Sequence, residues 1–299
     1  MELIEKALAK ARAQQEAAKQ TASQTGAESF PTDTASVMDA TSTSPPLEES
    51  RGRREQARLD AIRYVQTQVQ GVDQGHWLEN RLVAANSTDK VADIFRILRT
   101  KVLIPMRDNG WQTLAVVGAT PAVGKTTIAS NLAMSIALDA NQSVLLVDAD
   151  LRRPKVASYF GLQPEKGLGD VLSGAVSLES VLLNPGIDRL VVLPSTGSLQ
   201  NSTELLSSLR MQELLPELRN RYASRMVIFD LPPLLATGDT LAFLHNFDCA
   251  LLVVENGRNT AEELLEARRL LQGTNFLGWV LNKGDPGPVG GYYHYGATG

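Results

Sequence analysis

The chain has 299 residues, of which 43% are hydrophobic and 21% are charged. That length and composition fit two domains or one α/β domain with tails, and they exclude a fibrous or wholly disordered chain. The net charge of −4, from 29 basic and 33 acidic residues, argues against a general nucleic-acid binder, which is usually basic.

Cysteine content and hydropathy predict where the protein works. Cys249 is the single cysteine, so no internal disulfide can form and a reducing cytosol is expected. It lies in the apolar stretch 248–254, which favours a small buried residue over a nucleophile. No apolar run approaches the roughly 18 residues that span a bilayer, and residues 1–7 lack the pattern of a secretory signal. We therefore expect a soluble, cytoplasmic protein.

Residues 1–85 are expected to form an N-terminal region outside the main domain. Residues 1–19 have a narrow apolar stripe, which predicts a short, marginal helix. Ser, Thr, Ala and Pro dominate residues 21–50, which predicts a disordered linker because few large apolar side chains are present to bury. The arginine-rich residues 51–63 form either a solvated helix face or a docking patch for acidic partners or lipid.

A regular alternation of helical and strand patterns begins at about residue 86. Ser87, Thr88 and Asp89 offer N-cap chemistry for a helix. Its apolar side carries Val91, Ile94, Phe95, Leu98 and Val102. Short apolar runs predict strands at residues 114–117, 144–147, 190–193, 226–229, 250–254 and 277–281, with helices at 126–138, 211–222 and 261–271.

Near-continuous apolar strands that alternate with helices predict an α/β fold. The sheet should be doubly wound and mostly parallel, with helices on both faces. We expect this domain to span residues 86–283, followed by a mobile Gly/Tyr-rich tail at residues 284–299.

The strongest chemical signal is a phosphate-binding loop between a predicted strand and a predicted helix. Backbone N–H groups and the helix N-terminus would cradle phosphate oxygens there, with Ala119 in place of the usual first glycine. Lys125 would neutralise the β- and γ-phosphates, and the Thr126 hydroxyl would bind Mg²⁺. The expected nucleotide-binding residues are Ala119, Thr120, Pro121, Ala122, Val123, Gly124, Lys125, Thr126 and Thr127.

Acidic residues follow two other predicted strands. Asp148 and Asp150 come just past the strand at residues 144–147 and point the same way, so one can hold a metal-bound water while the other accepts a proton. Which of the two is the base stays open, and an ordinary polar strand end is the alternative. Asp230 ends the strand at residues 226–229, as a Walker B aspartate does, and is expected to bind Mg²⁺.

These three motifs together resemble the MinD/ParA-like branch of P-loop NTPases and, within it, the bacterial tyrosine kinases (BY-kinases) of capsule and exopolysaccharide systems. That family joins its Walker A loop to an A′ motif, which here reads Asp148-Ala-Asp150-Leu-Arg152-Arg153-Pro154. The similarity runs from about Lys90 to Lys283, and the long N-terminal extension is similar to that of stand-alone members from exopolysaccharide loci. The resemblance implies ATP and Mg²⁺ as cofactors, with Asp148 at the metal and Lys125, Asp148, Asp150 and Asp230 as catalytic residues.

The resemblance also implies roles for three further groups of residues. Asp93, Arg96 and Arg99 are similar to a family helix motif that mediates ring-like self-association. Asn282 corresponds to an asparagine that contacts adenine in the family. The tail would carry the autophosphorylation sites Tyr292, Tyr293 and Tyr295, although a flexible aromatic tail without a substrate role is the alternative.

The resemblance therefore favours an ATP-dependent protein-tyrosine autokinase that regulates exopolysaccharide or capsule synthesis or export. Its expected partners are a second copy of the chain, a membrane-embedded polysaccharide copolymerase that would recruit it to the membrane, and a tyrosine phosphatase, with no nucleic acid. One alternative is a ParA/MinD-type switch ATPase, but that class carries an extra lysine where this chain has Thr120. The other is a catalytically weak nucleotide-binding scaffold.

Overall fold

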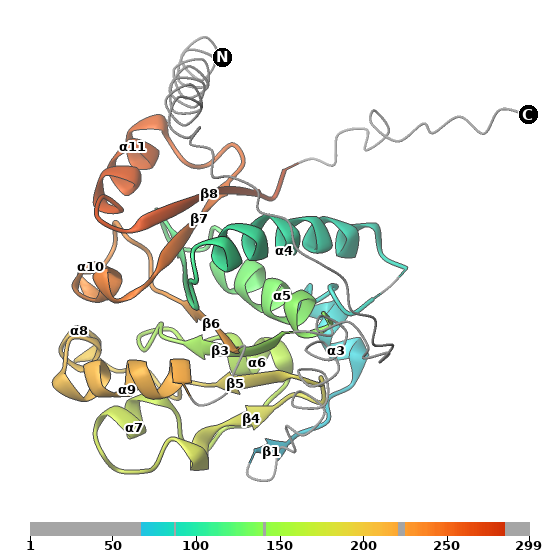
Figure 1. The fold of residues 1–299 in the computed structure, drawn as a ribbon, viewed down its shortest axis with the longest axis vertical. Helices are drawn as coiled ribbons and strands as arrows, with labels where there is room; N and C mark the ends of the chain where they lie inside the picture. The colour runs from blue at the N-terminus through green and yellow to red at the C-terminus, as the bar shows by residue number, and fades with distance from the viewer. Residues whose placement is uncertain (1–66, 87, 140–141, 221–224, 285–299) are drawn as a thin grey trace, which may run out of the picture. The chain divides into compact units, whose positions relative to one another are not determined.

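The strands form one sheet in the computed structural model, which describes residues 67–86, 88–139, 142–220 and 225–284 (Figure 1). The strands are β1 (Gln68–Val69), β2 (Thr113–Gly118), β3 (Ser143–Asp148), β4 (Leu183–Asn184), β5 (Leu190–Leu193), β6 (Arg225–Asp230), β7 (Cys249–Glu255) and β8 (Asn275–Asn282). Within these residues their order is β1-β4-β5-β3-β6-β2-β7-β8, and only the β4–β5 pair is antiparallel. The predicted mostly parallel sheet is confirmed.

Helices cover both faces of the sheet, as expected for a doubly wound fold. One face packs against α3 (Gln74–Glu79), α4 (Lys90–Asp108), α5 (Lys125–Ala137) and α6 (Val156–Phe160). The other packs against α7 (Leu168–Leu172), α8 (Ser202–Leu206), α9 (Leu209–Asn220), α10 (Asp239–Phe243) and α11 (Ala261–Leu270). Two short 3₁₀ turns are η1 (Glu179–Val181) and η2 (Leu244–Asn246).

Strand β2 is an interior strand of the sheet and lies between β6 and β7. Its side chains alternate between the two cores: Leu114 and Val116 face the α4–α5 side, and Ala115 and Val117 face the opposite side. All six of its residues are buried. The loop that follows β2 is therefore attached to a fully buried strand inside the sheet.

The folded unit begins upstream of residue 86, the boundary expected from the sequence. Strand β1 pairs with β4, and α3 buries Trp77, whose indole N–H donates to Phe160 O at 3.3 Å. Both β1 and β4 have two residues, too few to show a strand period in the sequence.

Helix α4 buries part of the side that was predicted. Phe95 and Val102 face the core as expected, but Val91 and Ile94 are 45% and 54% exposed. Apolar residues lie on two opposite sides of this helix, and periodicity alone does not say which side packs. The buried side carries Ala92, Phe95, Val102, Leu103 and Met106. The predicted cap is confirmed, since the Asp89 carboxylate accepts from Val91 N at 2.7 Å.

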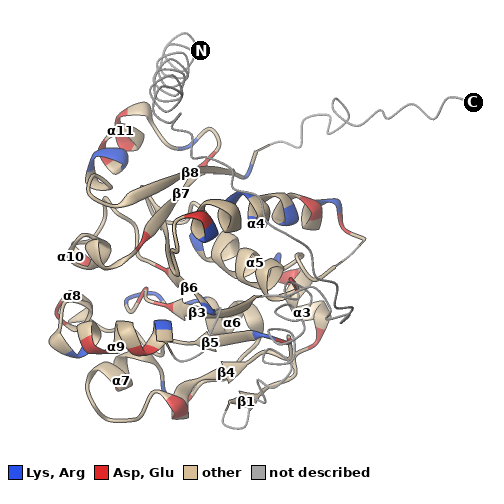
Figure 2. Cartoon of the chain, viewed as in Figure 1, with Lys and Arg blue, Asp and Glu red and all other residues tan. Residues whose placement is uncertain are grey.

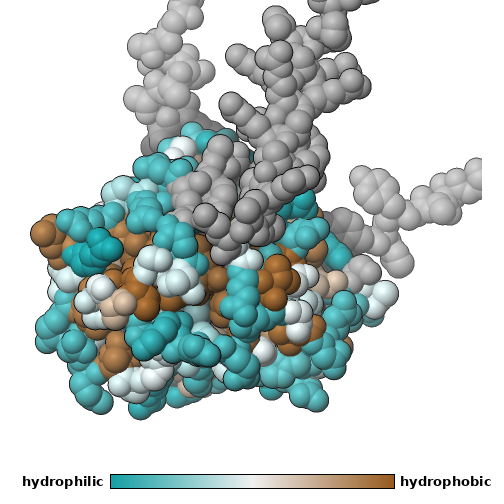
Figure 3. Space-filling view, turned by 90° about the horizontal axis from the view of Figure 1, so that it is seen from below, coloured by the Kyte–Doolittle hydropathy of each residue, from teal (hydrophilic) through white to brown (hydrophobic). Residues whose placement is uncertain are grey.

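The surface of the described residues carries charges of both signs. Figure 2 shows them interspersed on α4, α9 and α11, with few on the strands. Figure 3, seen from the β1 side, shows apolar residues in separate groups among hydrophilic ones. No helix in the described ranges combines the length and apolar character that crossing a membrane requires. Cys249 is buried, and burial raises its pKa to about 12, as expected for a packing residue.

Two sets of predictions lie outside the described residues. These are the helix, linker and arginine-rich segment within residues 1–66, and the tail that carries Tyr292, Tyr293 and Tyr295. They stay predictions.

Candidate active site

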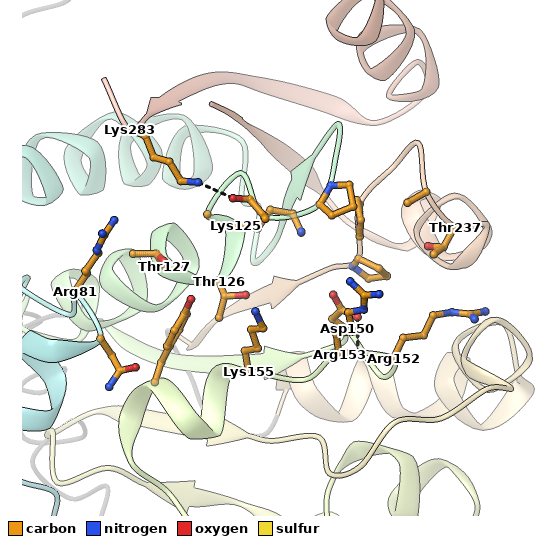
Figure 4. A pocket seen from close by; sticks show the side chains of 18 of the residues that line it. Arg81, Lys125, Thr126, Thr127, Asp150, Arg152, Arg153, Lys155, Thr237 and Lys283 are labelled. Carbon is orange, nitrogen blue, oxygen red and sulfur yellow. Dashed lines mark hydrogen bonds between the residues drawn. The ribbon is translucent and has the colours of Figure 1, made fainter. Parts of the chain in front are cut away.

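A pocket of about 600 Å³ opens at the carboxyl ends of the central strands (Figure 4). Its walls come from the loops after β2, β3, β6 and β8 and from residues 79–81. This edge of a parallel sheet is where open α/β folds bind ligands, and the volume suits a small-molecule site. The predicted nucleotide residues Lys125, Thr126 and Thr127 line it, and so does Asp150.

The loop after β2 has the backbone of a phosphate cradle. Gly124 has a φ of +95° and caps α5 without a side chain, which leaves the helix N-terminus facing the pocket. A Cβ on Gly124 would lie 2.0 Å from Asn282 Nδ2, and one on Gly118 would lie 2.6 Å from Val123 Cγ2. The loop therefore needs glycine at both positions, even though Ala119 replaces the usual first glycine.

Three side chains from the β7–β8 part of the sheet hold this loop. Asn282 Nδ2 donates to Val123 O at 2.8 Å, and Lys283 Nζ donates to Ala122 O at 2.9 Å. Asn259 Nδ2 donates to the Thr120 hydroxyl at 2.9 Å. Sequence reasoning had assigned a role only to Asn282, because no local pattern marks Asn259 or Lys283 as neighbours of the loop.

The Walker A and Walker B residues meet directly. The Thr126 hydroxyl donates to Asp230 Oδ2 at 2.5 Å, while Asp230 Oδ1 is buried and has no partner among the described residues. A buried carboxylate oxygen without a donor suits a cation or its water ligands. Mg²⁺ is usually bound by one or two carboxylates together with substrate phosphates, and the described residues hold no cluster of three or more His, Cys, Asp or Glu that would bind a metal alone. The site therefore fits a metal that arrives with a nucleotide.

Asp148 lies beside Asp230, because the two are register partners across β3 and β6. Asp148 Oδ2 accepts from the backbone N–H groups of Lys155 and Val156, both at 2.9 Å. Burial, and then the charge of Asp230, raise the pKa of Asp148 well above its usual range. Burial also raises the pKa of Asp230, to about 6, although Lys125 and the Thr126 hydroxyl counteract that rise. Asp148 is thus a fully buried group that holds the start of α6.

Asp150 is the carboxylate of the A′ motif that reaches the pocket. It is partly exposed and lines the cavity, whereas Asp148 is fully buried. Burial raises the pKa of Asp150, while a hydrogen bond from Arg153 N and the charge of Lys125 lower it. Of the two aspartates that the sequence offered as a base, Asp150 is the one with access to a ligand.

A buried polar cluster fixes the loop after Asp150. Arg152 Nε donates to Asp239 Oδ2 at 2.8 Å, and the Ser202 hydroxyl donates to the same oxygen at 2.6 Å. The Thr203 hydroxyl bonds the other oxygen of Asp239, whose side chain is fully buried. This cluster joins the A′ loop to α8 and α10, and sequence reasoning did not identify it because its members lie far apart in the chain.

The predicted self-association residues lie on α4 and are engaged within the chain. Asp93 and Arg96 form an ion pair, and Arg99 Nη1 donates to Ser135 O of α5 at 2.8 Å. None of the three lines the pocket. The Asp93 and Arg96 side chains remain 67% and 39% exposed, so this pair is accessible from outside.

Comparisons with known proteins agree with this geometry. A family model described as an AAA domain matches residues 112–266. The chain is 36% identical over 214 residues to the putative tyrosine-protein kinase EpsB of Ralstonia solanacearum, covering 70% of this chain and 27% of that protein. It is 32% identical to the tyrosine-protein kinase YwqD of Bacillus subtilis, covering 75% of this chain and 94% of that protein.

A solved structure that is similar to this chain is also that of a tyrosine kinase. The kinase domain of Escherichia coli tyrosine kinase ETK superposes with a TM-score of 0.64 at 33% identity, covering 77% of this chain and 93% of that one. The chain thus spans about a quarter of the length of EpsB, but nearly all of YwqD and of the ETK kinase domain.

Proposed function

The chain belongs to the bacterial tyrosine kinase family, and on that premise we propose that it is an ATP-dependent protein-tyrosine autokinase. Its substrate would be its own C-terminal tyrosines, and its role would be to regulate exopolysaccharide or capsule synthesis or export. The name EpsB in the comparison supports the polysaccharide role.

One observation carries the proposal: Lys125, Thr126 and Asp150 line one pocket, and Asp230, from a third segment, accepts a hydrogen bond from Thr126. Lys125 would compensate the charge of the transferring phosphoryl group, and Thr126 and Asp230 would hold Mg²⁺. Mg²⁺ would supply further neutralisation of phosphate charge. Asp150 would accept the proton of the tyrosine hydroxyl as its oxygen bonds the γ-phosphorus and the bond to ADP breaks.

The structure gives no support to the switch-ATPase alternative. That class needs a lysine at the position of Thr120 to reach across a dimer. Here the Thr120 hydroxyl accepts from Asn259, which itself donates to Glu263 Oε2 at 3.1 Å. The position is thus used to connect the phosphate loop to the start of α11.

Self-association is the partner interaction that the described surface supports best. Beside the Asp93–Arg96 pair, α4 exposes four apolar side chains, Val91, Ile94, Ile97 and Ile104. We propose that a second copy covers this face, which would allow one copy to phosphorylate the tail of another. A membrane-embedded copolymerase and a tyrosine phosphatase remain the other proposed partners, and the first would bring a cytoplasmic chain to the membrane.

The decisive experiment is phosphotyrosine detection after incubation of the full chain with Mg-ATP. Lys125→Met should abolish labelling, because losing one contact to developing charge typically slows transfer by about 10²- to 10³-fold. Unchanged circular dichroism would show that the variant is folded. Labelling as strong as that of the unmodified chain would show that the site is misplaced.

A matched variant tests the destination of the phosphoryl group. Replacing Tyr292, Tyr293 and Tyr295 together by Phe should remove most phosphotyrosine while transfer to an added tyrosine peptide continues. The Lys125→Met chain, mixed with an active chain lacking residues 284–299, should then become labelled. If it stays unlabelled where the intact chain labels itself, transfer between copies is wrong.

A further inference from the structure

Arg81 lies in the pocket although it precedes the predicted domain boundary. It lines the cavity together with Lys125 and Thr127. Figure 4 draws it beside Thr127, at the end of the pocket opposite Arg152 and Thr237. The Thr126–Asp230 contact marks where Mg²⁺ and the terminal phosphates would bind, and Arg81 lies beside Thr127, the residue that follows Thr126 in α5.

One buried side chain fixes the backbone of Arg81. Asn131 of α5 donates from Nδ2 to Arg81 O at 2.8 Å and to Thr127 O at 2.9 Å. Its Oδ1 accepts from Val83 N at 2.8 Å and from Ala84 N at 3.0 Å. All four hydrogen-bonding positions of this amide are used, and the residue is fully buried. Asn131 therefore joins the Arg81 segment to the first turns of the phosphate-loop helix.

The backbone of Arg81 itself adopts an uncommon conformation. Its φ is +60°, in the left-handed region that non-glycine residues seldom adopt. Upstream, the segment is anchored on α6, where His76 Nε2 lies 2.8 Å from Ser158 O and Trp77 bonds Phe160 O. Contacts before and after Arg81 therefore hold its backbone in this conformation, and this places the residue at the pocket wall.

The charge of Arg81 has no partner in the described part of the chain. Two other cations that line the pocket form ion pairs, Arg152 with Asp239 and Lys283 with Glu255 at 3.1 Å. The charge of Arg153 lowers the pKa of Asp150, and the charge of Lys155 lowers the pKa of Asp230. Arg81 is exposed, and no carboxylate of the described residues forms an ion pair with it.

We infer that Arg81 is a nucleotide-binding residue that contacts the α-phosphate. This inference rests on the proposed nucleotide site and adds to it a cation from outside the recognised motifs. Guanidinium groups form strong, charge-assisted hydrogen bonds to phosphate oxygens. Lys125 serves the β- and γ-phosphates, and Arg81 neutralises the phosphate that Lys125 leaves unpaired.

The test is titration calorimetry of the full chain with Mg-ADP and with a non-hydrolysable Mg-ATP analogue. Arg81→Asn removes the charge, and asparagine tolerates the left-handed backbone better than most residues. We expect it to weaken both nucleotides alike, by about 10- to 100-fold, as for loss of a charged hydrogen bond. Arg81→Lys should restore part of the affinity. Affinity unchanged, or lost only for the triphosphate analogue, would overturn the assignment.

Two controls separate this inference from the proposed site. Arg107→Asn, at an exposed arginine of α4 that does not line the pocket, should leave both affinities unchanged. If the unmodified chain binds neither nucleotide, the proposed function fails. If it binds both, and Lys125→Met weakens them but Arg81→Asn does not, only the inference fails.

Discussion

At the scale of single residues, the site keeps two carboxylates, those of Asp148 and Asp230, buried next to each other. Asp230 has a pKa of about 6, against an ordinary value of 3.8, because burial disfavours its charged form. Between about pH 4 and pH 6, Asp230 therefore binds more protons in the folded protein than in the unfolded chain. Over that range the contribution of Asp230 to the free energy of unfolding of the metal-free protein should fall as the pH rises. The full cost of burying its charge, about 3 kcal/mol, is reached above pH 6.

Asp230→Asn should consequently stabilise the metal-free domain while suppressing kinase activity. The amide removes the cost of burying a charge, so the melting temperature in EDTA at pH 7.5 should rise by several degrees. At pH 4, where Asp230 is protonated, the variant and the unmodified chain should melt together. Calorimetric melting at the two pH values checks this, and a variant that is less stable at pH 7.5 would contradict the assigned pKa.

At the scale of elements, the phosphate loop depends on its contact with β8. The position of Gly124 is restricted twice, by its φ of +95° and by Asn282 Nδ2, which would lie 2.0 Å from an added Cβ. Asn282 cannot withdraw without losing its bond to Val123 O. The end of β8 thus shapes the loop that follows β2.

Gly124→Ala should therefore lower both the melting temperature and the affinity for Mg-ADP. The matched control is Gly110→Ala, which has a φ of +67° but nothing within 4 Å of the added Cβ. Gly110→Ala should cost about 1 kcal/mol of stability from backbone strain alone and leave nucleotide binding intact. Equal losses of Mg-ADP affinity in the two variants would mean that the Asn282 contact is unimportant.

Which elements the sequence could predict depended on their length and composition. The central strands are continuous apolar runs such as Val144–Val147 within β3, which stand out in any window. The buried side of α4 was predicted only in part: Phe95 is buried as expected, but its neighbour Ile94 is exposed, because only the tertiary packing selects between adjacent apolar stripes. Likewise, Lys125 and Asp230 belong to local motifs, whereas Arg81 and Asn131 carry no signal until folding brings them together.

At the scale of the whole molecule, the exposed stripe of α4 should govern assembly. Apolar side chains grouped on one exposed helix side favour association. Ile94→Glu with Ile97→Glu should lower the mass measured by light scattering, while Mg-ADP affinity stays unchanged because neither residue lines the pocket.

Leu265→Glu serves as the control for this experiment. Leu265 is a 73% exposed apolar residue on α11, and its replacement should leave the mass unaltered. An unchanged mass in the α4 variant would show that copies of the chain associate elsewhere.

The position of β2 between two strands made later also sets the order in which the sheet can be completed during synthesis. Strand β2 ends at Gly118, but its neighbours β6 and β7 end at Asp230 and Glu255. At about 5–20 residues per second, the ribosome needs roughly 7 to 27 seconds after β2 before both neighbours exist. Asn259, Asn282 and Lys283, which hold the phosphate loop, are made later still. The candidate nucleotide site is therefore complete only after residue 283 has been made, and a nascent chain stalled earlier exposes buried strands such as β2 without completing that site.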